Sequence, residues 1–385
     1  MTEANPPRNV FFVGIDVDSM GGSQRVLHTL AQGMGDRGHR VELIGIRPSP
    51  EPFPYNADGR SYAHTTLLAE PSTPRPRPRT VGNRISPARR AEARQLRSER
   101  DDARTDLTRR LAAVRDGYIV FGSPWAADWV LSLEWQHLKG IGQYHESFAQ
   151  ARRGPNLGLI KRHYPLMEKS LVLSDGDAEE FRNQRVPNVS VMPNPLPFYP
   201  DTAAPVDTKK IGAVGRLDPI KRLDRLIEAF AAALPGRSGW ELHLFGDGPL
   251  EADLRRVAER AGVAEQVVFR GTANDMAAVY RELSVVAISS EREGRPMALA
   301  EAAACGVPCV SFDLSGGVRE LVDHGRTGTL VPSGDVPALS DALGELMDSD
   351  ELRTRYGAAG REHVKHLSLS RVLDRWDRVF EEIDR

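Results

Sequence analysis

The chain has 385 residues, 40% of them hydrophobic, and a formal net charge of −2 at pH 7. This length corresponds to roughly two to three ordinary domains and supplies enough apolar side chains for their cores. The small net charge gives no indication of nucleic-acid binding, and no apolar run approaches the roughly 20 residues that span a bilayer. Because residues 2–9 are polar and lack an apolar signal-peptide core, we expect a cytoplasmic protein.

The first half of the chain alternates strand-like apolar runs with helix-like amphipathic stretches. Strands are expected at 10–13, 41–44, 118–121, 141–144 and 171–173. A helix expected at 23–37 carries Val26, Leu27, Leu30 and Met34 on one face. This alternation is typical of α/β domains with a doubly wound parallel sheet. We therefore place a first Rossmann-like domain at residues 1–200.

The arginine-rich stretch 71–110 is the most individual feature of the chain. Prolines and arginines alternate from Pro74 to Arg79, and an arginine-rich helix-like segment follows. One hypothesis is that Arg75–Arg110 attracts an anionic partner through its charge, either a membrane surface or a phosphate-bearing polymer. The alternative is a solvated insertion that binds nothing.

The second half repeats the α/β pattern after an interruption. The proline-containing stretch 193–208 breaks the alternation, as an interdomain linker does. Strands are then expected at 211–214, 242–245, 266–269, 285–288 and 309–312, and a helix at 221–233. We place a second Rossmann-like domain at residues 201–369. Residues 370–385 have apolar side chains at helical spacing and are expected to form a terminal helix.

The two cysteines of the chain, Cys305 and Cys309, lie in an apolar stretch around Gly306 and Pro308. There is no second pair to complete a metal site. We expect both to be reduced, buried packing residues.

Two glutamates, Glu293 and Glu301, lie between a strand-like segment and a helix-like one. Residues 285–288 are apolar and mostly β-branched, whereas 297–304 are rich in helix formers. Free amides at the start of that helix favour an anion, and two carboxylates can accept hydroxyl groups of one ligand. Acidic residues at this spacing more often form a solvated helix face, so the flanking sequence decides between the two interpretations.

Beyond the glutamates the chain continues through Ala303-Ala304-Cys305-Gly306-Val307-Pro308 to Gly316-Gly317. With the Glu-x₇-Glu spacing, this pattern resembles the retaining family 4 glycosyltransferases. The resemblance implies a GT-B fold, in which two Rossmann-like domains face a central cleft and the terminal helix packs back on the first domain. It makes residues 1–200 the acceptor-side domain and residues 201–369 the domain that binds the nucleotide sugar. It also implies that Glu293 contacts the donor sugar and Glu301 the nucleotide ribose.

The resemblance assigns phosphate and sugar contacts to three further side chains. Arg216 and Lys221 follow an expected strand at the spacing that grips the pyrophosphate, and both would stabilise charge on the leaving phosphate. The alternative for Lys221 is a solvent-exposed lysine at the start of a helix, without a functional role. His145 stands where the family has a histidine beside the donor sugar, with a structural histidine as its alternative.

Glycine-containing loops supply the remaining expected donor contacts. Gly21 and Gly22 resemble the family's loop beneath the donor phosphate, where backbone amides can approach an anion. The acidic residue that often follows two places later is missing here. The other donor-binding residues implied are Gly246, Asp247, Arg270, Gly294, Arg295, Pro296 and Met297.

The implied reaction transfers a sugar from a nucleoside diphosphate sugar to an acceptor hydroxyl, with the anomeric configuration retained. The acceptor would be a cell-envelope polymer, a lipid or another glycan, and neither a metal nor another cofactor is required. The protein would be cytoplasmic, with peripheral contact to the inner face of the membrane if Arg75–Arg110 binds it. A sugar-nucleotide epimerase of the same fold and a non-catalytic polyanion-binding protein are the alternatives. Residues 14–22 lack the Gly-x-Gly-x-x-Gly pattern of a nicotinamide-dependent dehydrogenase.

Overall fold

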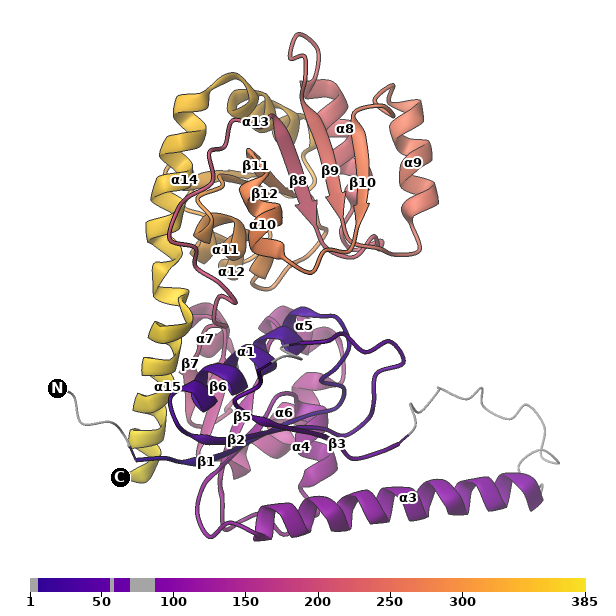
Figure 1. The fold of residues 1–385 in the computed structure, drawn as a ribbon, viewed down its shortest axis with the longest axis vertical. Helices are drawn as coiled ribbons and strands as arrows, with labels where there is room; N and C mark the ends of the chain where they lie inside the picture. Colours follow the sequence, from indigo (N-terminus) through magenta and orange to yellow (C-terminus); the bar gives the residue numbers. More distant parts are fainter. Residues whose placement is uncertain (1–5, 56–58, 70–86) are drawn as a thin grey trace. The chain divides into compact units, whose positions relative to one another are not determined.

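The structure, a computed structural model, describes residues 6–55, 59–69 and 87–385. It contains two compact units, one formed by residues 1–192 with 373–385 and the other by residues 193–372 (Figure 1). The units therefore divide between residues 192 and 193. The sequence predicted a domain boundary eight residues later, between 200 and 201. The proline-arginine alternation at 74–79 lies outside the described residues.

The first unit is built on a parallel sheet with the strand order β3-β2-β1-β4-β5-β6-β7. The strands are β1 Asn9–Gly14, β2 Arg40–Gly45, β3 Ala63–Thr66, β4 Tyr118–Phe121, β5 Lys139–Gln143, β6 Lys169–Val172 and β7 Val189–Val191. Its helices are α1 Gly22–Asp36, α3 Pro87–Ala112, α4 Pro124–Val130, α5 Phe148–Arg153, α6 Asn156–His163, η1 Tyr164–Leu166 and α7 Asp175–Asn183. The strand order reverses between β1 and β4, which makes that pair the topological switch point.

The second unit repeats this architecture with the order β10-β9-β8-β11-β12-β13. The strands are β8 Lys210–Val214, β9 Glu241–Phe245, β10 Val267–Gly271, β11 Val285–Ile288, β12 Cys309–Phe312 and β13 Gly328–Val331. Its helices are α8 Leu223–Ala233, α9 Glu251–Arg260, α10 Met276–Arg281, α11 Met297–Ala304, α12 Gly316–Leu321, α13 Val336–Asp348, α14 Asp350–Val364 and η2 Lys365–Leu367. Here the switch point lies between β8 and β11.

The cores explain why these segments form buried parallel strands. β4 reads Tyr-Ile-Val-Phe and β11 reads Val-Val-Ala-Ile, and every side chain in both is buried. Strands with helices on both faces need such continuous apolar runs. α8 covers its sheet with Leu226, Ile227 and Phe230, none of which is exposed. The expected pair of Rossmann-like α/β domains is confirmed.

The stretch expected as a linker is part of the second unit's core. Leu196, Ala204 and Val206 are buried in that unit. The Ala204 amide donates to the carbonyl of Cys305 at 2.7 Å, and the Leu196 amide donates to the carbonyl of Leu367 at 2.8 Å. Because its backbone is hydrogen-bonded to the second unit and its apolar side chains are buried there, the stretch is an ordered part of that unit and not a free linker. Cys305 and Cys309 are both free and buried, as the sequence predicted.

The terminal helix α15, Leu369–Asp384, belongs to the first unit from residue 373 onward. Trp376 and Phe380 are fully buried there, and the Trp376 ring meets Phe12 edge-on with centroids 6.2 Å apart. Arg37 adds ion pairs of 2.7 Å to Asp374 and to Asp377. The helix is therefore fixed by an apolar face and by charge pairs at its rim.

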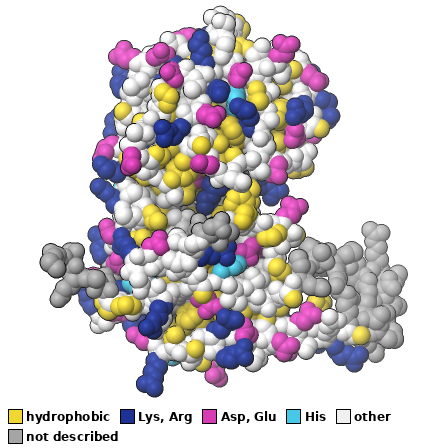
Figure 2. Space-filling view, viewed as in Figure 1, with side chains coloured by type: hydrophobic (Ala, Val, Ile, Leu, Met, Phe, Trp, Pro, Cys, Tyr) yellow, Lys and Arg dark blue, Asp and Glu magenta, His cyan; other side chains and the backbone are white. Residues whose placement is uncertain are grey.

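Among the described side chains of helix α3, the buried ones lie towards its C-terminal end. Leu107 and Leu111 are fully buried, whereas residues 94–102 are all exposed. Residues 94–110 include six arginines and four acidic residues. Asp106 pairs with Arg110 at 2.8 Å. The same interspersion of basic and acidic side chains covers the visible face of the molecule (Figure 2). None of the described helices is long and apolar enough to cross a membrane.

Candidate functional site

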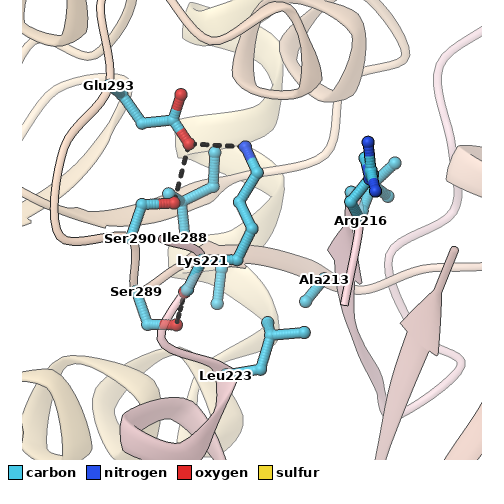
Figure 3. A pocket seen from close by; sticks show the side chains of 11 residues that line it. Ala213, Arg216, Lys221, Leu223, Ile288, Ser289, Ser290 and Glu293 are labelled. Atoms are coloured by element: carbon cyan, nitrogen blue, oxygen red, sulfur yellow. Dashed lines mark hydrogen bonds and ion pairs between the residues drawn. The ribbon is translucent and has the colours of Figure 1, made fainter. Parts of the chain in front are cut away.

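A small pocket lies at the switch point of the second unit, where parallel sheets bind ligands outside their carboxyl ends (Figure 3). The β8 side contributes Gly215, Arg216 and Lys221. The β11 side contributes Ser289, Ser290 and Glu293. Three of the four side chains to which the sequence assigned a catalytic role thus line one pocket.

An ion pair between Lys221 and Glu293 occupies the pocket (Figure 3). The Lys221 Nζ lies 2.7 Å from the Glu293 Oε1, and the Ser290 hydroxyl donates to the same oxygen at 2.7 Å. The remaining volume is about 10 Å³, which is room for about one water molecule. Arg216 is exposed at the rim. The carboxylate is therefore the resting counterion of the ammonium group.

The loop between β8 and α8 is held in a strained conformation by the β11 side. Arg222 has a positive φ of 47°, a backbone region that costs about 1 kcal/mol or more for a residue with a side chain. The Ser289 hydroxyl lies 3.0 Å from the carbonyl oxygen of Lys221 and 2.9 Å from that of Arg222. The Arg222 guanidinium also pairs with Asp224 and lowers the pKa of that carboxyl. These contacts fix Lys221 before the helix, which begins at Leu223 and not at 221 as expected.

Backbone hydrogen bonds join the loops that follow β8, β9 and β10. The amide of Gly215 donates to Phe245 at 3.0 Å, and the amide of Gly246 donates to Gly271 at 2.7 Å. A Cβ on Gly246, whose φ is +128°, would lie 2.1 Å from the Gly215 carbonyl oxygen. Glycine is thus required there for loop-to-loop contact.

Asp247 and Arg270, the two polar residues expected in these loops, are not among the residues that line the pocket. Asp247 and Arg270 are both exposed. The Asp247 carbonyl accepts from the Leu217 amide at 2.8 Å, and the Arg270 Nε donates to the Nδ1 of His243 at 3.0 Å. The sequence predicted that both side chains contact the nucleotide. The fold places them at the ends of the neighbouring strands β9 and β10.

Helix α12 supports the loop that carries Glu293. A Cβ on Gly317 would lie 2.3 Å from the Gly294 carbonyl oxygen, and the Ser315 hydroxyl donates to that oxygen at 2.7 Å. Arg295 lies 3.5 Å from the carboxylate of Glu320. The glycine pair at 316–317 therefore allows α12 to approach this loop closely.

Helix α11 starts directly after that loop, with Pro296 as its N-cap and Met297 as its first residue. No side chain caps it and no acidic residue lies in its first turn. Its first amides are thus available to an anion, as the sequence predicted for this helix start.

Glu301 has different surroundings from Glu293. Its side chain is 5% exposed, and its Oε2 accepts a hydrogen bond of 3.1 Å from the Tyr280 hydroxyl of α10. It is not among the residues that line the pocket. The structure thus separates a carboxylate that pairs with a lysine from one that is held by a tyrosine.

The first unit has a larger cavity, of about 520 Å³, at its own switch point. Gly14, Ile15 and Asp16 line it after β1, and Gly122, Ser123 and Trp125 line it after β4. Ser23, Gln24, Leu27 and Arg47 complete the lining. Of these side chains, the sequence pointed only to Leu27, as part of the apolar face of the helix expected at 23–37. Arg47 and Trp125 each follow an expected strand, but neither lies in a recognisable motif.

Gly21 and Gly22 lie next to that cavity at the start of α1. The Gly21 amide donates to the Tyr55 hydroxyl at 3.0 Å, and no side chain caps the helix. A Cβ on Gly22 would meet nothing within 4 Å. Packing within the described residues therefore does not explain the glycine at position 22.

His145 follows β5 in the first unit and is half-buried. On either side of it, the Tyr144 hydroxyl donates to Glu146 at 2.7 Å, and Ser147 begins α5 with a capping box completed by Gln150. The strand and the capped helix thus fix the backbone at His145. It is not among the residues that line the 520 Å³ cavity.

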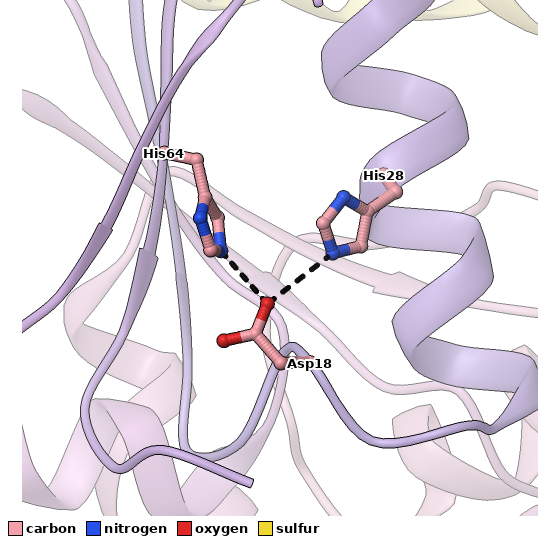
Figure 4. A group of neighbouring side chains, drawn as sticks. All are labelled: Asp18, His28 and His64. Carbon is pink, nitrogen blue, oxygen red and sulfur yellow. Dashed lines mark ion pairs between the residues drawn. The ribbon is translucent and has the colours of Figure 1, made fainter. Parts of the chain in front are cut away.

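Asp18, His28 and His64 form a polar cluster beside the glycine loop (Figure 4). The His64 Nε2 lies 2.9 Å from the Asp18 Oδ1. The His28 Nε2 lies 2.9 Å from the Val17 carbonyl, and its Nδ1 lies 2.5 Å from the Tyr62 hydroxyl. Because a carbonyl only accepts, the His28 Nε2 carries its proton and is not available as a metal ligand. The cluster anchors the loop after β1, and no sequence pattern predicted it.

Comparison with known families covers most of the chain. Residues 20–197 match Glycosyltransferase Family 4, and residues 199–363 match Glycosyl transferases group 1. The chain carries two glycosyltransferase domains. The Lys221–Glu293 pocket lies in the second glycosyltransferase domain, and the 520 Å³ cavity is lined mostly by residues of the first.

Individual relatives of these glycosyltransferase domains are distant. An exopolysaccharide phosphotransferase of Streptomyces coelicolor is 28% identical over 95% of this chain, which spans only 40% of that protein. A glycosyltransferase of Haemophilus influenzae named as uncharacterized is 23% identical over 95% of this chain and 98% of its own length. An S. aureus TarM variant crystallised with fondaparinux, α-GlcNAc-glycerol and UDP superposes with a TM-score of 0.75 at 12% identity, covering 97% of this chain and 99% of TarM. With the two parallel sheets, this likeness confirms the expected GT-B fold class.

Proposed function

We propose that the protein is a retaining, metal-independent glycosyltransferase that uses a nucleoside diphosphate sugar. One observation carries the proposal: Lys221 and Glu293 form a hydrogen-bonded ion pair at the switch point of the domain that matches Glycosyl transferases group 1. A cation that grips phosphate and a carboxylate that accepts sugar hydroxyls are the two groups that such a donor requires.

Each site residue has a proposed role at the donor. Lys221 exchanges Glu293 for the diphosphate, and Arg216 binds the same group from the rim. Both cations stabilise the charge that grows on the leaving phosphate. Glu293, released from the lysine, accepts hydroxyls of the sugar.

The remaining donor contacts are proposed on the same basis. Glu301 accepts ribose hydroxyls, and the amides that open α11 at Met297 face the distal phosphate. His145 and the Gly21-Gly22 loop are proposed to contact the sugar and the donor phosphate from the first unit. Glu293 is the one carboxylate among the residues that line the second-unit pocket, and we assign it to the sugar hydroxyls. We therefore propose that the acceptor attacks from the side of the leaving group, which takes the acceptor proton.

The donor and the acceptor are proposed only as classes. TarM was crystallised with UDP, which makes UDP-sugars the first donors to test. The Streptomyces relative is named for exopolysaccharide, which favours a cell-envelope glycan, polymer or lipid as the acceptor. Transfer to such an acceptor with retention gives an α-linked product from an α-linked donor.

The test is a nucleotide-release screen against UDP-, GDP- and ADP-sugars, with and without EDTA. We expect release of the nucleoside diphosphate from one donor, unaffected by EDTA and lost in Lys221→Ala and Glu293→Ala. Lys210→Ala is the matched control, because Lys210 lies at the opposite end of the same strand β8. Thermal shift with each donor measures binding where no acceptor supports turnover.

Other outcomes would overturn specific parts of the proposal. Release of a nucleoside monophosphate would indicate transfer of a phosphosugar, the activity class suggested by the name of the Streptomyces relative. An epimerised nucleotide sugar would indicate an epimerase. Inversion at the anomeric carbon in the NMR spectrum of the product would exclude retention. Neither turnover nor donor binding would favour a non-catalytic polyanion-binding protein.

A further inference from the structure

The cavity of the first unit contains an arginine, Arg47, that forms no ion pair with any of the described residues. Arg47 lies two residues beyond the end of β2, and its amide donates to the Ile15 carbonyl at 2.7 Å, which fixes its backbone beside the loop after β1. The side chain lines the cavity and is exposed. Within the described part of the chain, no carboxylate pairs with it. A guanidinium group in a concave site is a ready partner for a phosphate or a carboxylate, which it can bind with two parallel hydrogen bonds.

Two other side chains of the lining suit a sugar or polyol. Trp125 is 47% exposed, and its indole N–H donates to the Asn156 side chain at 3.0 Å, which fixes the ring while leaving apolar surface uncovered. Asp16 holds its Oδ1 on the amides of Asp18 and Ser19, both at 3.0 Å. Those two amides disperse its charge, and the second carboxylate oxygen can accept hydroxyls.

We infer that this cavity binds an acceptor whose sugar or polyol ring carries a phosphate or carboxylate group, and that Arg47 pairs with that anion. The inference rests on the proposed transferase function, because it names the acceptor class of that reaction. It concerns the first unit alone and needs no donor to be tested. The cavity volume of about 520 Å³ falls in the range of small-molecule sites, which is roughly 300–1,000 Å³.

The test compares three ligands that share one hexose ring. Glucose 6-phosphate, glucuronate and glucose carry a phosphate, a carboxylate and a neutral hydroxymethyl group, respectively, at the same end of the ring. NMR titration of the full chain measures the dissociation constant of each. We expect at least one of the two anionic ligands to bind about tenfold more tightly than glucose, and the stronger of the two names the anion.

Matched arginine variants separate the effect of the cavity from that of general surface charge. Arg47→Gln should abolish the preference for the anionic ligand, whereas Arg40→Gln should preserve it. Arg40 is also exposed and begins β2, whereas Arg47 lies beyond the other end of that strand. Trp125→Ala should weaken all three ligands and leave the preference intact. Melting temperatures of the variants verify that each is folded.

The inference is overturned if the unmodified protein shows no preference among the three ligands, including the case of no measurable binding, or if Arg47→Gln keeps the preference. Failure of the proposed function gives a different result. In that case the nucleotide-release and donor-binding assays are negative, while the ligand preference in the first unit is still measured.

Discussion

The two units place a pocket at the same topological position and give it opposite properties. The second-unit pocket leaves about 10 Å³ and pairs its lysine with its own glutamate. The first-unit cavity leaves about 520 Å³, and its Arg47 pairs with no carboxylate in the described part of the chain. A shared fold therefore fixes where a ligand binds, whereas the loop residues decide how closely the site is fitted to it.

The difference has an electrostatic reason. Charged groups in a narrow pocket lose much of their contact with water, so an unpaired lysine there would be costly, and Glu293 with Ser290 compensates for it. Arg47 lies in a wide, solvated cavity where water screens its charge. We therefore expect the first-unit cavity to tolerate changes of side-chain shape that the second-unit pocket does not.

The largest expected effect comes from exchanging the cation in each pocket for the other type. Lys221→Arg keeps the charge but has to place a planar fork where about 10 Å³ remains, so we expect donor turnover to fall about 100-fold, or by about 3 kcal/mol. Arg47→Lys should change turnover by less than about threefold. Steady-state kinetics with a saturating acceptor measures both. Equal effects of the two exchanges would contradict the contrast between a fitted and an open pocket.

A second prediction concerns the stability of the first unit at low pH. Burial lowers the pKa of His28 to about 4 from the ordinary 6.5, so the folded protein resists a proton that the unfolded chain accepts. Stability is therefore fully present above pH 6.5 and is lost as the pH falls towards 4, by about 3 kcal/mol in total. Urea denaturation across this range measures the loss.

His28→Gln is the control for this pH dependence. The variant has no titrating group at this position, so the part of the slope between pH 6.5 and 4 that is due to His28 should disappear. An unchanged slope would mean that other groups, such as His243 in the second unit, whose pKa is also lowered by burial, are responsible.

Sequence reasoning predicted the strands with long apolar runs and failed for those without them. β4, β11 and β12 lie where the runs 118–121, 285–288 and 309–312 were expected. β3 reads Ala-His-Thr-Thr with no buried residue, and β7 has three residues, so neither carries a readable pattern. Edge strands need less apolar surface than central ones, which removes the signal on which the prediction depends.

The candidate site shows the same limit. The sequence named Lys221 and Glu293 through a resemblance, and the structure brings the two together at 2.7 Å. It assigned no role to Ser289 and Ser290, because a serine after a strand has no distinctive pattern. Ser289 bonds carbonyl oxygens on the β8 side of the pocket, and Ser290 bonds the carboxylate of Glu293 on its own side. Only the folded chain creates these contacts.

Ser290 provides a second, smaller test of the fitted pocket. Ser290→Ala removes the hydrogen bond to Glu293 and leaves the ion pair, so we expect donor turnover to fall about five- to tenfold, corresponding to about 1 to 1.5 kcal/mol. Ser311→Ala is the matched control, because that serine is also buried and bonds a backbone carbonyl away from the pocket lining. If both variants reduce turnover alike, the effect is one of general packing.

The smallest expected effect distinguishes a glycine kept for a ligand from one kept for the backbone. Gly22 opens α1, and a Cβ there meets nothing within 4 Å, so Gly22→Ala should leave stability unchanged or raise it by up to about 1 kcal/mol. If a donor phosphate approaches this backbone, the added methyl group should still lower turnover severalfold. Gly38→Ala should do the reverse, because the φ of Gly38 is +90°, and alanine there costs about 1 kcal/mol of stability without touching a pocket. Thermal melts combined with kinetics measure both properties, and full turnover in Gly22→Ala would remove the glycine loop from the proposed donor site.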